Sequence, residues 1–329
     1  MQERALDRDG PVGSGSRVTT TALPPVLPAL SPARPAVPAA ALAVTAMLSV
    51  QVGAALSLGL FGTVGPSGTA WLRLCAASVV LVAVARPRLS ALPRHALRSA
   101  ALLGVITAAM TLAYFEAIAR LPLGTAVAVE FLGPLSVAVL TRARGAAALL
   151  WPALALVGVL VLTEPWAGGT DPVGLGFALL AACGWAAYIL LTQRVGDALP
   201  GVTGLALSMP VAAACAAVVG APQAAGSLTP MVLAQAAGLA LLLPVLPYAL
   251  EMAALRRLTT AAFGTLTALE PAVGVLVGLV LLGQVPHAAQ AAGVALVMAA
   301  GLGAQRTGTR LPAVDLPAAA PRELVTAGR

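Results

Sequence analysis

The chain has 329 residues, of which 59% are hydrophobic and only 9% are charged, and its mean hydropathy is +0.94. These values lie far outside the range of soluble domains and predict an all-α polytopic membrane protein. All 19 basic residues are arginines, and the formal net charge is +7. Because the arginines stand singly or in pairs at the ends of apolar runs, they indicate membrane topology rather than a surface that binds nucleic acid.

Ten apolar runs are expected to be membrane spans, given a rise of ~1.5 Å per residue and a hydrocarbon core of ~30 Å. They are, in chain order, Ala39–Leu60, Ser67–Ala85, Leu97–Ile118, Leu123–Leu140, Ala146–Leu162, Val173–Thr192, Val202–Val219, Met231–Leu255, Leu258–Leu282 and Ala288–Ala304. Residues 1–37 and 306–329 are rich in Pro, Ala and Arg, and both are expected to be disordered tails.

The arginines also predict the orientation in the membrane, because cytoplasmic connections retain basic residues during insertion. With a cytoplasmic N-terminus, seventeen arginines fall in cytoplasmic segments, only Arg120 falls in an external one, and Arg73 lies within the second span. Both termini are therefore predicted to be cytoplasmic.

The two halves of the chain repeat one another. Glu116 and Glu251 are 135 residues apart, as are Leu123 and Leu258, which begin the matching stretches LGTA and LTTA. Since five is an odd number, two copies of five spans must have opposite orientations in the membrane, as in many secondary transporters. Residues 38–164 and 172–305 are the two expected inverted repeats.

A carboxylate and a proline stand together near the middle of the fourth and ninth spans. Pro134 frees the backbone carbonyl of Glu130, and Pro271, which follows Glu270, frees that of Thr267. Charges and free carbonyls are tolerated at membrane depth only beside protein or a water-filled cavity. Interruptions at matching places in two halves predict a substrate and proton path between the halves, with helix breaks at the two prolines.

Other polar residues lie within the spans. Arg73 could pair with a glutamate, bind a substrate carboxylate or extend toward the outer surface, and Gln51 and Tyr114 could line the path. Glu116 and Glu251 stand near span ends, where pairing with Arg120 or Arg256 is as good an explanation as a functional role.

Three stretches are similar to the EamA-type drug/metabolite transporter superfamily, in its branch of RhtA-like threonine and homoserine exporters. They are QVGAALSLGLFGTVGPSGTAWLR (51–73), YFEAIARLPLGTAVAVEFLGP (114–134) and YALEMAALRRLTTAAFGTLTALEP (248–271). The resemblance covers about residues 39–304 and implies export of small amino acids across the inner membrane in exchange for protons. The chain departs from the family at Gln284, where members often have Glu.

We therefore expect a secondary exporter whose cavity is lined by the first, third and fourth spans and by the sixth, eighth and ninth. Its partners would be a small-molecule substrate, protons and the lipid bilayer, and either a monomer or a homodimer is compatible with the sequence. No cofactor or metal is expected, because the cysteines and histidines lack ligand spacing. Export of another metabolite or of a toxic amphipathic compound is the alternative, and a membrane enzyme or a scaffold is the alternative class. An enzyme would need catalytic residues that converge at one leaflet, and the sequence shows none.

Overall fold

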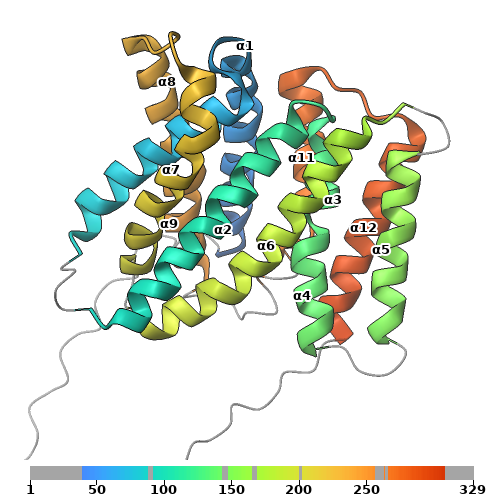
Figure 1. Cartoon of the computed structure of the whole chain (residues 1–329). Coiled ribbons are helices and arrows are strands. Elements are labelled where there is room, and N and C mark those ends of the chain that lie inside the picture. The colour runs from blue at the N-terminus through green and yellow to red at the C-terminus, as the bar shows by residue number, and fades with distance from the viewer. Residues whose placement is uncertain are drawn as a thin grey trace, which may run out of the picture. The chain divides into compact units, whose positions relative to one another are not determined.

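The structure, a computed structural model, describes residues 39–87, 92–142, 147–164, 169–199, 202–255, 263 and 266–307. Contacts divide the chain into Met1–Ala36 and Val37–Arg329, and all described residues belong to the second unit. Regular structure within these ranges is helical throughout (Figure 1), which confirms the predicted all-α class. The predicted tails lie outside the described residues, except that the last helix continues to Thr307.

The described helices follow one another along the chain with short connections. They are α1 (Ala39–Ala85), α2 (Arg94–Ile118), α3 (Leu123–Glu130), α4 (Leu132–Arg142), α5 (Ala147–Thr163), α6 (Pro172–Ala198), α7 (Thr203–Ala224), α8 (Pro230–Ala240), the π-helix η2 (Leu241–Val245), α9 (Leu246–Leu255), α11 (Glu270–Leu282) and α12 (Ala288–Thr307). Five ranges in the described part are long and apolar enough to cross a membrane: Ala39–Ala85, Arg94–Ile118, Pro172–Val195, Thr203–Ala224 and Pro230–Glu251. The predicted fourth, fifth, ninth and tenth spans correspond to shorter apolar helices.

The first two predicted spans are joined by a bend within a single helical range, Ala39–Ala85. The chain turns at Gly65, whose φ of 71° and ψ of 169° lie outside the helical region. Only glycine adopts this conformation without strain, and a Cβ there would also collide with the side chain of Gln223 in α7. Gln223 holds the bend in place, because its Oε1 accepts a hydrogen bond of 2.8 Å from the backbone N–H of Gly68.

Residues at the helix ends explain where several helices begin and stop. Asp171 and Thr229 each accept a hydrogen bond from a backbone N–H in the first turn of the following helix, and each is followed by proline at the first helical position. Both features favour helix initiation. Helix α11 ends at Gly283, which has a φ of 66° and so takes the left-handed conformation usual after a helix C-terminus.

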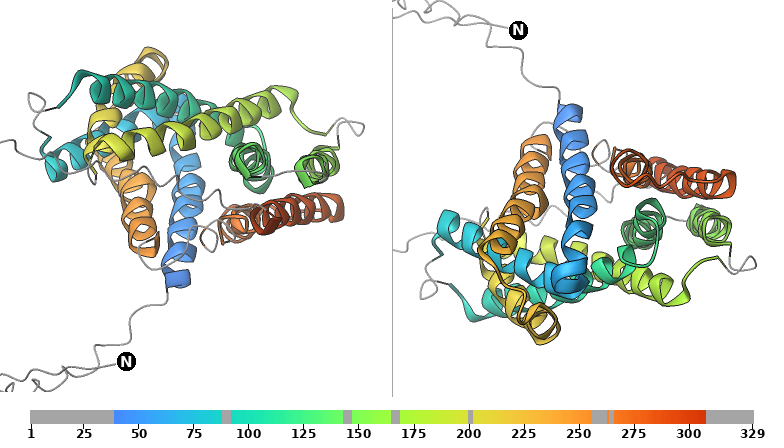
Figure 2. Two further views of the ribbon diagram at one scale, coloured as in Figure 1. Left: turned by 90° about the horizontal axis from the view of Figure 1, so that it is seen from below. Right: turned by 90° about the horizontal axis from the view of Figure 1, so that it is seen from above.

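Small residues allow the helices to approach closely. Helices α5 and α12 pack where Gly158 faces Gly293, and α2 packs on α7 where Gly104 faces the backbone of Ser208. In the absence of a hydrophobic driving force between helices in lipid, such close contacts supply the van der Waals attraction that holds spans together. Figure 2 shows the first half of α1, in dark blue, between α9 on one side and α11 on the other, and α1 contacts both of these helices.

The outer surface is apolar, as contact with lipid requires. Large hydrophobic side chains such as Val79, Val218 and Val280 are 69–77% exposed, a pattern that a soluble protein does not tolerate over a whole surface. Hydroxyl groups within the helices are satisfied locally. Ser57 and Thr107, for example, each donate to the backbone carbonyl four residues earlier. Both hydroxyl groups therefore have a hydrogen-bond partner within their own helix, as a lipid environment requires.

Five connections that the sequence predicts to be external meet at one end of the bundle, the upper end of Figure 1. Ser67 donates to Glu116, Gly68 to Gln223, and Leu123 to Gln284. Arg120 reaches Asp171 at 4.0 Å and His287 pairs with Glu164 at 3.2 Å. These contacts place the five connections on one side of the helices, as an alternation of spans requires.

Candidate functional site

Helices α3 and α11 pack against each other in opposite directions. Gly124 lies against Val275, Gly274 against Val127, and Gly278 against Leu123. From one contact to the next, the residue number rises in α3 and falls in α11, as expected for antiparallel helices. If this register continues, Glu130, the last residue of α3, lies level with the start of α11. The packing therefore brings Glu130 and Glu270 together, and the two carboxyl groups lie close enough to interact electrostatically.

Both glutamates stand where a helix is interrupted. Phe131 forms a turn directly after Glu130, three residues before Pro134, which lies in the first turn of α4. Ala268 and Leu269 form a turn directly before Glu270, and Pro271 is the second residue of α11. Thr267, half-buried, is the last helical residue before that turn. Glu270 is thus in the first turn of a helix, where the backbone dipole favours a negative side chain.

Arg73 in the second half of α1 is buried and interacts electrostatically with Glu130. Its exposure is 5%, and its guanidinium carbon lies 4.4 Å from the centre of the Phe115 ring of α2. The suggestion that Arg73 extends to the surface is therefore wrong. The Nε and Nη1 atoms have no hydrogen-bond partner among the described residues, although the charge interacts with Glu130 at longer range.

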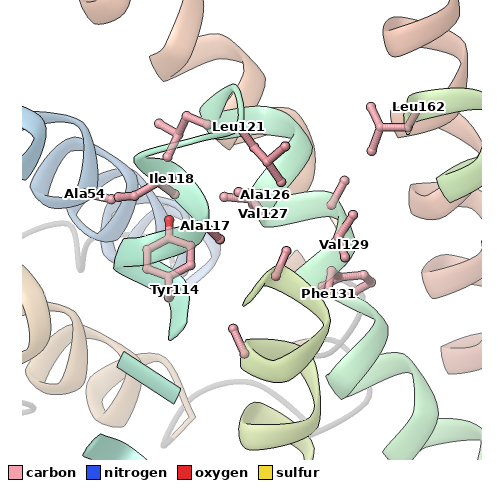
Figure 3. Packing of buried hydrophobic residues seen from close by; sticks show 14 of the residues in the cluster. Ala54, Tyr114, Ala117, Ile118, Leu121, Ala126, Val127, Val129, Phe131 and Leu162 are labelled. Atoms are coloured by element: carbon pink, nitrogen blue, oxygen red, sulfur yellow. The ribbon is translucent and has the colours of Figure 1, made fainter. Parts of the chain in front are cut away.

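Gln51 and Tyr114 complete the constellation. Gln51 is 1% exposed and lies within hydrogen-bonding reach of Glu270. Tyr114 is 7% exposed and interacts electrostatically with both glutamates and with Arg73. Figure 3 shows Tyr114 on α2, within the packed cluster that also holds Ala54 of α1 and Val127 of α3. The Tyr114 hydroxyl and Gln51 Oε1 also lack partners in the described part of the chain.

Glu251 in α9 belongs to the same constellation, which the sequence alone did not establish. It is half-buried and interacts electrostatically with Glu270, Tyr188 and Tyr248. Its counterpart Glu116 behaves differently, because it pairs with Arg120 at 2.5 Å, one helical turn later. The residue one turn after Glu251 is Leu255. The presence of an arginine four residues after Glu116, and of a leucine four residues after Glu251, is the sequence signal that could have distinguished the two glutamates.

A separate pocket of about 290 Å³ opens near the upper end, between α3, α11 and the start of α12. Thr125, Gln284, His287 and Gln290 supply its polar lining. The lining does not include Arg73, Glu130 or Glu270, so this pocket is distinct from the charged constellation. Among the described residues, no three of the His, Cys, Asp and Glu side chains are grouped in a way that could hold a metal ion.

Apolar helices with a lipid-facing surface, closed around buried acidic and basic side chains, define a multi-pass membrane transport protein. Residues 172–303 match the EamA-like transporter family. The chain is 35% identical over 272 residues to the threonine/homoserine exporter RhtA of Salmonella typhimurium (strain SL1344), covering 82% of this chain and 92% of the relative. It is 36% identical over 265 residues to RhtA of Escherichia coli (strain K12), covering 80% and 89%.

The chain therefore belongs to the EamA-like transporter family, in the branch of the RhtA-type exporters, and it is a transporter and not an enzyme. A crystal structure of another protein, 20% identical in sequence, superimposes with a TM-score of 0.57 over 82% of this chain and 97% of that one. At this level of identity the similarity shows that the two share a fold.

Proposed function

We propose that the chain exports small amino acids of the threonine and homoserine type across the bacterial inner membrane, in exchange for protons. Its relatives carry the name of threonine/homoserine exporters. The single observation that supports the proposal in this chain is the buried constellation, in which a cationic Arg73 lies close to Glu130 without forming an ion pair with it, while Tyr114 interacts with Arg73 and with both glutamates. Opposite charges held apart in this way suit a zwitterion.

The same glutamates account for the coupling to protons. Desolvation favours the neutral form of a carboxyl group, whereas a bound ammonium group favours the charged form. Glu130 or Glu270 can therefore hold either a proton or the ammonium group of the substrate. Competition between the two for one site is sufficient for antiport, because each half of the cycle then carries one of them across the membrane.

We also propose the inverted-repeat arrangement, with ten spans and both termini in the cytoplasm. The contacts between helices support it. Helix α2, the third span, packs on α6 and α7, the sixth and seventh. The eighth span, formed by α8, η2 and α9, packs on α1, which holds the first and second. In the proposed repeat, the first, second and third spans correspond to the sixth, seventh and eighth. The contacts of the third span with the sixth and seventh are therefore the counterparts of the contacts of the eighth span with the first and second.

The proposed function can be tested in cells that produce the chain, compared with cells that do not. Threonine or homoserine should fall inside the producing cells and rise in the medium, and collapse of the proton gradient should abolish the difference. Resistance to ethidium, measured in the same cells, tests export of amphipathic compounds. Amino-acid pools that stay unchanged despite a normal amount of membrane-inserted protein would refute the proposal.

A further inference from the structure

Four buried side-chain atoms around the two glutamates have no hydrogen-bond partner among the described residues: Gln51 Oε1, Arg73 Nε, Arg73 Nη1 and the Tyr114 hydroxyl. Burying a polar group without a partner costs roughly 1–3 kcal/mol, and more for a charged one. Four such atoms in one place are therefore difficult to explain as part of a closed hydrophobic core. They mark a place in the bundle that is suited to a polar ligand.

The unpaired atoms fall into a group of hydrogen-bond donors and a group of acceptors. Arg73 presents two donor nitrogens with three N–H groups between them, and the Tyr114 hydroxyl can add an O–H donor, so this part of the site is suited to an anion. Gln51 presents an acceptor, as do the carboxylates of Glu130 and Glu270, so that part is suited to a group with three N–H donors. An α-amino acid has a carboxylate at one end and an ammonium group at the other.

We propose that Arg73 and Tyr114 bind the α-carboxylate of the transported amino acid, while Gln51, Glu130 and Glu270 bind its ammonium group. This assignment rests on the amino-acid export proposed above, and it names the chemical group that the substrate must carry. A planar guanidinium binds a carboxylate in a two-pronged geometry that a lysine cannot reproduce. Phe115, which lies against the guanidinium, holds that plane in position.

The arginines of this chain illustrate the contrast. Arg120 has two carboxylates from the chain itself, since it pairs with Glu116 and approaches Asp171 at 4.0 Å. Arg73 has none within ion-pair distance in the described part of the structure, although it is far more buried, with 5% exposure against 33% for the Arg120 side chain. A buried cation without an anion is strongly destabilising, and a substrate carboxylate would supply that anion.

Exchange measurements on the full-length protein in liposomes test this assignment. The vesicles are loaded with threonine, labelled threonine is supplied outside, and L-threonine or L-threoninol is added as a competitor. Threoninol keeps the amine and the side chain but has a CH₂OH group in place of the carboxylate. Loss of a buried charged partner predicts that threoninol competes at least about 30-fold less well. Equal competition by the two compounds would overturn the carboxylate subsite.

Variants then identify the residues that discriminate between threonine and threoninol. In Arg73→Gln the ratio between threoninol and threonine should fall to near one, and in Tyr114→Phe it should fall by about 10-fold or less. Arg120→Gln is the matched control and should keep the wild-type ratio. A wild-type ratio in a folded Arg73→Gln variant would place the carboxylate elsewhere. If that variant does not fold, as judged by gel filtration, the comparison of competitors on the wild-type protein decides the matter.

The same experiment separates this inference from the proposed function. Wild-type vesicles that exchange no amino acid would refute amino-acid transport, and the subsite with it. Vesicles that exchange threonine but are inhibited equally by threoninol would leave the transport function in place and refute only the role of Arg73 and Tyr114.

Discussion

The side chain of Gln284 joins the end of α11 to the beginning of α3: its Oε1 accepts a hydrogen bond of 2.9 Å from the backbone N–H of Leu123. The first N–H groups of a helix have no partner within the helix, so Gln284 satisfies one that would otherwise be free. The backbone N–H of Gln284 is itself bonded to Gly278. This contact closes the pair of helices that carry Glu130 and Glu270 at the upper end of the bundle.

Gln284→Ala should loosen this closure. Loss of the hydrogen bond should lower the free energy of unfolding by about 1 kcal/mol, measured as a lower midpoint of thermal unfolding in detergent. Gln284→Glu should keep the bond, because a carboxylate accepts it equally well and is favoured at a helix N-terminus. Gln290→Ala, in the wall of the neighbouring pocket, is the control. A midpoint for Gln284→Ala equal to that of the control would show that the bond does not stabilise the fold.

Gly124→Ala should disturb the contact between α3 and α11. An added Cβ would collide with Val275, whose Cα would lie only 3.0 Å away, and overpacking of this kind costs about 1–3 kcal/mol. The expected result is reduced stability together with reduced exchange of threonine in vesicles. Gly176→Ala in α6 is the matched control, because a Cβ there meets nothing within 4 Å. If both variants exchange at the wild-type rate, the close packing is not needed for transport.

Glu130→Gln and Glu270→Gln should each remain folded, because an amide resembles the protonated carboxyl group. At least one should lose efflux driven by a proton gradient, since an amide cannot release a proton. Exchange of threonine for threonine should continue more weakly, because the amide oxygen still accepts a hydrogen bond from the ammonium group but carries no charge. The measurement is labelled efflux from vesicles with and without a pH gradient, between pH 6 and 8. Wild-type rates in both single variants and in the double variant would remove the glutamates from the coupling mechanism.

Gly226 lies in the connection between α7 and α8, at the upper end of the bundle. The distribution of arginines predicts that this end is external. A reporter active only outside the cytoplasm should therefore be active when fused after Gly226. A cysteine placed at Arg310, in a variant without the native cysteines, should resist a membrane-impermeant thiol reagent in intact cells. Labelling of that cysteine from outside would reverse the topology.

Much of this architecture could be predicted from the sequence, because hydropathy and arginine placement act locally along the chain. The repeat then placed Glu130 and Glu270 in corresponding spans, the fourth and the ninth, and pairing between Glu116 and Arg120 is confirmed by the ion pair. The bend at Gly65 was not predicted, because it depends on Gln223 in a distant helix. The same reason explains why the burial of Arg73 against Phe115 and the bond from Leu123 to Gln284 could not be predicted.

The bend at Gly65 also has a mechanical consequence. Gln51 lies before it and Arg73 after it on the same helix, so the groups assigned to the two ends of an amino acid belong to one hairpin, which Gln223 fastens to α7. Glu130 and Glu270, by contrast, lie on two separate helices, α3 and α11. Any shift of α11 against α3 would change the distance between the glutamates, whereas the separation of Gln51 and Arg73 is set within the hairpin itself. The substrate would then keep its contacts with Arg73 and Gln51 while its contacts with the two glutamates change.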